Sequence, residues 1–180
     1  MNSSKTLAGP SLLQHKKPKK LIFMLHGYGD TAENFIHIAK YLDQTEWHAN
    51  YIALDAPNSI PNYPAGRQWF PINLNSSNNI EMDESKRKIV NCDILESVKL
   101  LNHTIDKIKD SYDLSYKDCF LLGFSQGGMI TFEFGNYCHD RLGGLAILSG
   151  RIIREKLISN FSLLKTPIFI SHGEKDEVIP

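Results

Sequence analysis

The sequence predicts an α/β fold, in which a mostly parallel, doubly wound sheet is covered by helices on both faces. Short apolar runs, each long enough for one strand, alternate with longer stretches of helical periodicity. The runs are continuously apolar, which is typical of parallel strands buried on both sides. A length of 180 residues is enough for one domain with its own core. The predicted strands span residues 21–25, 51–54, 119–122, 145–148 and 168–170.

The predicted helices lie between these strands. The clearest has apolar residues at spacings of four, three, four and three, with Lys and Asp between them. A second helix is predicted over residues 31–42, with Thr31 as its N-cap, and a third over residues 155–164. Residues 58–82 are rich in Pro and Gly and are predicted to form a long loop. The apolar face of the clearest helix consists of Ile94, Val98, Leu101, Ile105 and Ile108.

Composition narrows the class of protein. The formal net charge is zero, so the charge gives no reason to expect binding to nucleic acid or to an anionic membrane. Three scattered cysteines are too few for a disulfide framework or a zinc site, and we expect reduced thiols in a cytoplasmic protein without a metal. No integral membrane segment is predicted. Residues 1–20 are expected to form a mobile tail, and residues 21–180 the domain.

The stretch Gly123–Gly127, which reads Gly-Phe-Ser-Gln-Gly, is the strongest chemical signal. It lies between a predicted strand and a helix-length segment, so Ser125 is predicted to stand on a sharp turn above the sheet edge. Side chains at the two glycine positions would collide with such a turn. Ser125 is therefore the candidate nucleophile.

A nucleophilic serine also needs a base, an acid that orients the base, and donors for the oxyanion. Asp176 follows the strand at 168–170 and comes after Ser125, the chain order of doubly wound hydrolases. It is the acid candidate, with a solvated loop carboxylate as the alternative. The glycine-rich stretch 26–30 follows the first strand, so the N–H groups of Tyr28 and Gln126 are expected to form an oxyanion hole. The alternative there is an ordinary strand-to-helix turn.

Four stretches of the chain share a pattern, and they are His26–Asp30, Gly66–Pro71, Gly123–Gly128 and His172–Asp176. Together they resemble the phospholipase/carboxylesterase family, in the acyl-protein thioesterase-like branch of the α/β-hydrolases. The resemblance implies Ser125 as nucleophile, Asp176 as triad acid, and Tyr28 and Gln126 as oxyanion donors. It also implies a shallow acyl groove with Trp69 near the site, for which simple loop packing is the alternative.

The resemblance also implies parts that this sequence lacks. The family continues past the Asp loop through another helix, a last strand, a loop with the catalytic histidine, and a closing helix. This chain stops at Pro180, so we expect an α/β-hydrolase domain without the last strand and closing helix. His26 and His172 are expected to be structural, and no other histidine fits the role of base. Without a base, only residual catalysis is expected.

These observations lead to two functional hypotheses. The first is a serine hydrolase that cleaves carboxylic esters, or thioesters or lysophospholipids, through an acyl-serine intermediate and without a cofactor. The second is a catalytically silent remnant of such an enzyme or a non-hydrolytic acyl-ligand binder. The strand at 168–170 would be an exposed edge in either case, so self-association along it is a further expectation.

Overall fold

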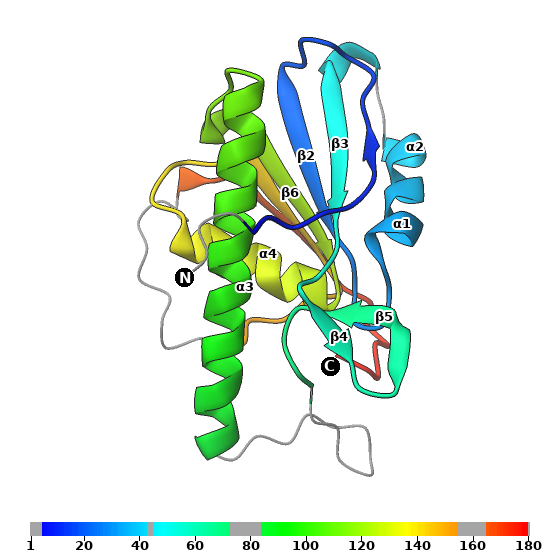
Figure 1. The fold of residues 1–180 in the computed structure, drawn as a ribbon, viewed down its shortest axis with the longest axis vertical. Coiled ribbons are helices and arrows are strands. Elements are labelled where there is room, and N and C mark those ends of the chain that lie inside the picture. Colours follow the sequence, from blue (N-terminus) through cyan, green and yellow to red (C-terminus); the bar gives the residue numbers. More distant parts are fainter. Residues whose placement is uncertain (1–4, 43–44, 73–83, 155–164, 180) are drawn as a thin grey trace.

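The computed structural model describes residues 5–42, 45–72, 84–154 and 165–179. A six-stranded sheet with the order β1-β3-β2-β6-β7-β8 forms its centre (Figure 1). Every neighbouring pair from β3 to β8 is parallel, and β1 alone runs antiparallel to its neighbour. This topology confirms the predicted fold class. The strands are β1 (Ser11–Leu12), β2 (Lys20–Leu25), β3 (Ala49–Leu54), β6 (Cys119–Phe124), β7 (Gly144–Leu148) and β8 (Ile168–Ser171).

Helices cover the two faces of the sheet unequally. Alternate residues of a strand point to opposite faces, and Phe23 of β2 packs with α3 (Glu84–Ser111) and α4 (Gln126–Tyr137) on one side. Met24 packs on the other side with α1 (Ala32–Phe35), followed by η1 (Ile36–Ile38) and α2 (Ala39–Leu42). Figure 1 shows the long α3 crossing one face and the short α1 and α2 beside β3. The larger of the two apolar cores is therefore the one beneath α3 and α4.

The apolar spacing in α3 predicted its buried face correctly. Ile94, Val98, Leu101 and Ile105 have no exposed surface, and Ile108 packs against the same core. The helix predicted over residues 31–42 is instead broken into α1, η1 and α2. Thr31 is its N-cap as predicted, since its hydroxyl accepts the Asn34 N–H.

The region predicted as one long loop contains a hairpin. Strands β4 (Asn58–Ile60) and β5 (Tyr63–Gln68) pair antiparallel, so the loop prediction is wrong there. Proline and glycine in this stretch belong to the turn of the hairpin and to close backbone contacts. They do not mark an irregular loop here. Residues 73–82 of the predicted loop and the helix predicted over residues 155–164 lie outside the described residues.

The amino-terminal segment differs from the mobile tail that we expected. The Leu7 side chain is buried in the main core, and its N–H donates to Thr104 Oγ1 at 2.9 Å. Ser11 and Leu12 then pair with β3 as the strand β1. One apolar side chain in a polar stretch gives no periodic signal, so the sequence did not reveal this contact.

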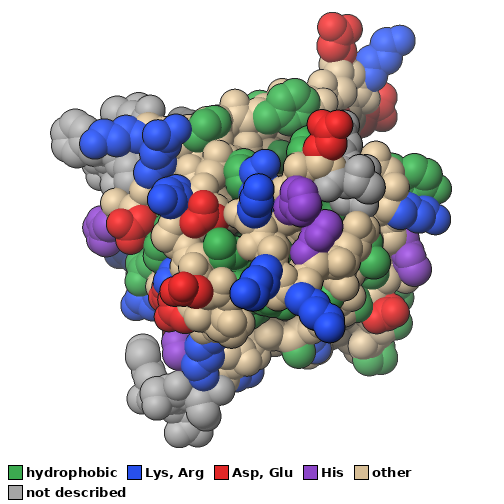
Figure 2. Space-filling view, turned by 90° about the horizontal axis from the view of Figure 1, so that it is seen from above, with side chains coloured by type: hydrophobic (Ala, Val, Ile, Leu, Met, Phe, Trp, Pro, Cys, Tyr) green, Lys and Arg blue, Asp and Glu red, His purple; other side chains and the backbone are tan. Residues whose placement is uncertain are grey.

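The β8 end of the sheet is open within the described residues. Phe169 and Ile170 each keep 62% of their surface exposed, and Ile168 keeps 40%. An apolar cavity of about 410 Å³ lies beside β8 at the amino ends of the strands, between Trp47, Phe120 and Phe169. Figure 2 shows that basic, acidic and apolar side chains mix over the end of the molecule seen from above, without a patch of one sign.

Candidate active site

Ser125 occupies a strained turn at the carboxyl end of β6. Its backbone has φ 51° and ψ −116°, a conformation that residues with a side chain rarely adopt. The Ser125 N–H donates to the carbonyl of Leu148 at the end of β7, at 2.8 Å. The turn leads directly into α4, so Ser125 stands at the helix amino terminus and is partly exposed.

The glycines around Ser125 allow the turn to approach its neighbours. A β-carbon at Gly123 would lie 2.2 Å from the carbonyl oxygen of Gly127. A β-carbon at Gly127 would lie 2.1 Å from the carbonyl oxygen of Leu25, at the end of β2. Both contacts are far shorter than van der Waals separation, which confirms the predicted need for glycine at both positions.

The loop of residues 26–30 lies directly beside this turn. A β-carbon at Gly27 would stand 3.4 Å from the Ser125 β-carbon. Tyr28 is the next residue and is 40% exposed. Gln126 is the first residue of α4, and the first N–H groups of a helix have no intrahelical partner. Gln126 is thus the sequence neighbour of Ser125, and the loop that carries Tyr28 lies beside Ser125 in space.

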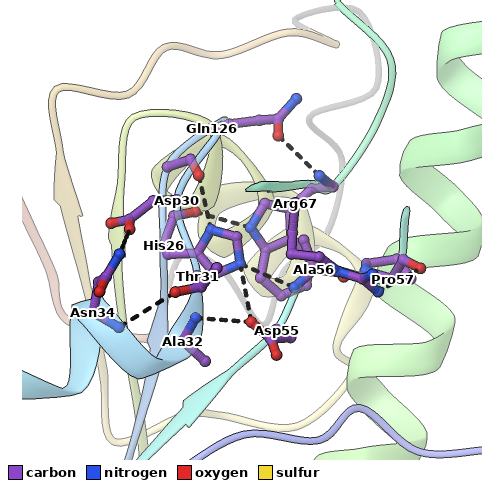
Figure 3. A network of polar contacts seen from close by, with 12 residues as sticks. His26, Asp30, Thr31, Ala32, Asn34, Asp55, Ala56, Pro57, Arg67 and Gln126 are labelled. Atoms are coloured by element: carbon purple, nitrogen blue, oxygen red, sulfur yellow. Dashed lines mark hydrogen bonds and ion pairs between the residues drawn. The ribbon is translucent and has the colours of Figure 1, made fainter. Parts of the chain in front are cut away.

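His26 anchors the start of this loop and is fully buried. Its Nδ1 donates to the carbonyl of Gly27 at 2.7 Å, and its Nε2 accepts the Ala56 N–H at 3.0 Å (Figure 3). Burial lowers the pKa of His26, against an opposing effect of the Gly27 carbonyl and of Asp55. A neutral ring with both nitrogens engaged fits the structural role expected for this histidine.

Trp69 and Gln126 tie the neighbouring loop to the site from beneath. The Trp69 indole N–H donates to the carbonyl of His26 at 2.9 Å. The Gln126 side chain accepts the Trp69 main-chain N–H at 2.8 Å and donates to the carbonyl of Phe70 at 2.7 Å. The Trp69 side chain has no exposed surface. This burial and these hydrogen bonds are what the alternative of simple loop packing describes for Trp69.

Asp176 lies in the loop that follows β8. Its carboxylate accepts the N–H groups of Ile179 at 2.8 Å and Val178 at 3.0 Å. These hydrogen bonds, that of Ile179 first, lower the pKa of Asp176. The Ser149 hydroxyl also bonds to it, and Ser149 follows β7, the strand between β6 and β8. The acid candidate and Ser125 therefore belong to the same carboxyl edge of the sheet.

The described histidines do not supply an evident base. His172 Nε2 lies 2.6 Å from the carbonyl of Ile179 and 3.7 Å from Asp176 Oδ2. All seven histidines of the chain fall within the described ranges, and none there forms a hydrogen bond with the Ser125 hydroxyl. The described residues also hold no group of three or more His, Cys, Asp or Glu side chains that could bind a metal ion.

The sequence analysis gave no role to two arginines that form buried or partly buried bonds, although Arg67 lies within the matching stretch Gly66–Pro71. Arg67 in β5 bonds to main-chain carbonyls next to His26, and Arg154 forms a buried ion pair with Glu133 of α4 at 2.5 Å. Neither residue belongs to a catalytic pattern. Their partners lie on other elements, so the spacing of residues along the chain gave no signal for these contacts. For Arg67, a correct prediction of the β4–β5 hairpin would have indicated that its main chain pairs with a neighbouring segment.

A parallel sheet with a strained serine between strand and helix, and a glycine-rich loop beside it, defines an α/β-hydrolase. Comparison with known proteins agrees. The family model described as Phospholipase/Carboxylesterase matches residues 12–180, and the chain belongs to that family of ester hydrolases.

Individual relatives are ester and thioester hydrolases by name. "Acyl-protein thioesterase 1" of Kluyveromyces lactis is 30% identical over 175 residues, which cover 90% of this chain and 72% of that protein. "Carboxylesterase SOBER1" of Arabidopsis thaliana is 30% identical over 169 residues, with coverage of 89% and 71%. The crystal structure of SOBER1 superposes with a TM-score of 0.69 at 28% identity, covering 87% of this chain and 74% of that one.

A further solved structure supports the fold alone. Esterase PE8 superposes with a TM-score of 0.82 at 24% identity, over 98% of this chain and 79% of that chain. In the part of the chain that the structure describes, no helix has the length and apolar character needed to cross a bilayer.

Proposed function

We propose that this protein is a serine carboxylesterase-type hydrolase with Ser125 as its nucleophile. The observation that carries the proposal is the strained backbone of Ser125, which projects the residue from the carboxyl end of β6 beside the loop of residues 26–30. Strain of this kind persists only where surrounding contacts enforce it, and it concentrates at functional sites. Here the enforcing contacts are the hydrogen bond to Leu148 and the close packing of Gly127 on Leu25.

The proposed reaction has two steps. Ser125 Oγ attacks the carbonyl carbon of the ester, its proton passes to a base, and the carbonyl electron pair moves onto oxygen. The N–H groups of Tyr28 and Gln126 stabilise that oxyanion, and collapse of the intermediate expels the alcohol or thiol, which takes up the proton. Water then attacks the acyl-serine, releasing the carboxylic acid and restoring Ser125. Asp176 would orient a histidine base, which is the role of the acid in such triads. None of the described histidines bonds to the Ser125 hydroxyl, so within these residues water takes the proton, and we expect the residual catalysis of a site without its base.

The substrates proposed are carboxylic esters, with thioesters or lysophospholipids as further members of the same acyl class. Relatives named as acyl-protein thioesterase and carboxylesterase support this range. Buried Trp69 would hold the 26–30 loop from beneath rather than contact the acyl chain. We also propose a cytoplasmic location, since three scattered cysteines are too few for the disulfide framework typical of an oxidising compartment.

A second candidate function is non-hydrolytic binding of an acyl ligand, or a silent remnant of the enzyme. It is favoured by the histidines: both ring nitrogens of His26 are engaged, and His172 Nε2 donates to Ile179. A serine without a base keeps the reactivity of an alcohol. Binding through the oxyanion donors would then remain without turnover.

One experiment separates the two candidates. Hydrolysis of short p-nitrophenyl esters is measured for the wild-type chain and for Ser125→Ala, and both are treated with a fluorophosphonate probe. Ser125-dependent hydrolysis together with labelling of the wild type alone supports the hydrolase. Equal rates for the two proteins reject Ser125 as the nucleophile. Absence of labelling in a folded protein supports the silent binder.

We further propose that two copies associate through β8. Its four residues are exposed and apolar side chains point to both faces, whereas its outer edge has no neighbouring strand among the described residues. An exposed apolar edge is a template for another strand. Antiparallel pairing of β8 with β8 of a second copy would satisfy both edges at once through a two-fold axis.

A further inference from the structure

The backbone of Tyr28 is held between restraints on both of its sides. On the amino-terminal side, the His26 ring joins the carbonyl of Gly27 to the Ala56 N–H. On the carboxyl-terminal side, the Gly29 N–H donates to the carbonyl of Arg67 at 2.9 Å. The Arg67 N–H in turn donates to the carbonyl of Asp30 at 3.1 Å. The loop therefore pairs with β5 through two main-chain hydrogen bonds centred on one residue.

The Arg67 side chain fastens that same residue to a third segment. Its Nε donates to the carbonyl of Ala56 at 2.9 Å, and one of its terminal nitrogens donates to the carbonyl of Pro57 at 3.1 Å. Ala56 is also the residue whose N–H binds the His26 ring. Figure 3 shows Arg67, Ala56, Pro57 and His26 closing around the start of the loop.

We propose that Arg67 is a positioning residue, which clamps the loop of residues 26–30 so that the Tyr28 N–H points at the reacting oxygen. This inference rests on the proposed function, because it assigns a role in the reaction at Ser125. Oxyanion stabilisation depends on donors held in place before the charge develops. A glycine-flanked loop such as Gly27–Gly29 has little stiffness of its own, so the restraint must come from its neighbours.

The chemistry of the guanidinium suits this task. Arg67 presents several donors in one rigid plane and reaches two carbonyls at once. A lysine ammonium is a point donor on a flexible stem, so it would hold one carbonyl at a time. The hairpin β4–β5 would then be free to shift relative to Ala56, and the two main-chain bonds to the loop would shift with it.

The test compares Arg67→Ala, Arg67→Lys and the control Arg141→Ala. Arg141 is exposed and precedes β7, at the opposite end of the sheet from the site. Amide hydrogen exchange of residues 27–30 is measured for each protein, together with kcat and KM for a p-nitrophenyl ester. For Arg67→Ala we expect exchange in this loop at least about tenfold faster and kcat at least about tenfold lower, with KM unchanged. For Arg67→Lys both the exchange rate and kcat should lie between those of Arg67→Ala and the wild type. Arg141→Ala should match the wild type in both.

The outcomes separate the clamp from the proposed function. Unchanged exchange in Arg67→Ala overturns the clamp, whatever the activity. Faster exchange with an unchanged kcat overturns the catalytic role and leaves a purely structural one. Exchange that rises equally in β2 and α4 signals general loosening and also contradicts a local clamp. If wild type and Ser125→Ala hydrolyse the ester equally, the proposed function fails, and the exchange measurement alone decides on the clamp.

Discussion

Gln126 binds the main chain of Trp69 through its side chain: Oε1 accepts the Trp69 N–H at 2.8 Å. The same amide donates to the carbonyl of Phe70 at 2.7 Å, and all of these groups are buried. The side chain of the residue after the candidate nucleophile thus fixes the neighbouring loop. Its main-chain N–H, at the start of α4, is the oxyanion donor that we propose.

Replacing Gln126 with leucine should destabilise the protein. The change leaves the Trp69 N–H and the Phe70 carbonyl buried without a partner, at a cost of about 1–3 kcal/mol for each group. Chemical denaturation should therefore show a free energy of unfolding lower by about 2–6 kcal/mol. Gln126→Met, which also removes both hydrogen-bonding groups and keeps a similar volume, should lose a similar amount. A loss of less than about 1 kcal/mol for both variants would contradict this account.

Because the backbone at Ser125 is strained, a substitution that relieves this strain should stabilise the folded protein. Glycine adopts a positive φ without steric cost, so Ser125→Gly should raise the free energy of unfolding by about 1 kcal/mol. Ser125→Ala keeps a β-carbon and should leave the strain in place. Neither variant should hydrolyse esters. Thermal melts of the three proteins give the comparison, and a melting temperature of Ser125→Gly at or below that of Ser125→Ala would argue against stored strain.

Gly127 should be the least replaceable glycine at the site. A methyl group there meets the Leu25 carbonyl at 2.1 Å, so Gly127→Ala must displace β2 or α4. Such overpacking costs about 1–3 kcal/mol or more. Gly173→Ala is the matched control, because the nearest atom to its β-carbon would be 3.9 Å away. Urea unfolding should show a large loss for the first variant and a small one for the second; similar losses would count against the packing argument.

His26 should make stability depend on pH. Its pKa in the folded protein lies below the ordinary value of 6.5, because burial disfavours the charged ring. The unfolded chain therefore binds the proton more readily, so the stabilisation is fully present above about pH 6.5 and is lost as the pH falls toward the folded pKa. His26→Gln keeps an acceptor near Ala56 but does not titrate.

The measurement is the melting temperature between pH 5 and 8. On acidification the melting temperature of the wild type should fall more than that of His26→Gln. At pH 8 the melting temperature of His26→Gln should be lower than that of the wild type, because the hydrogen bond to Gly27 is gone. His37→Gln, which changes an exposed histidine of η1, is the control and should follow the wild type. Parallel pH curves for wild type and His26→Gln would refute the assignment.

A single charged side chain on β8 should weaken the proposed self-association. Phe169→Lys places an ammonium on the exposed edge strand, where a second copy would have to bury it. Sedimentation velocity should then show a lower oligomer fraction than for the wild type. Tyr41→Lys, which changes a side chain that is 79% exposed on α2, is the control and should not alter the distribution. A wild type that is monomeric at high concentration would overturn the proposal.

Sequence patterns alone determined the class of the fold and the order of the candidate site residues along the chain. Continuous apolar runs predicted the parallel strands, because strands buried on both faces need apolar residues at every position. The spacing from Ile94 to Ile108 predicted the buried face of α3. The turn around Ser125 followed from local geometry, since glycine is required within a few residues of the serine itself.

Tertiary structure decided what depends on contacts between distant segments. The burial of Leu7 on Thr104, the hairpin β4–β5, and the hold of Arg67 on Ala56 and Pro57 each join residues from different elements. Such contacts produce no periodic pattern in the sequence, because each joins single residues that are far apart along the chain. For the same reason the sequence could nominate Trp69 for the site, whereas only the folded chain shows it buried beneath the loop that it supports.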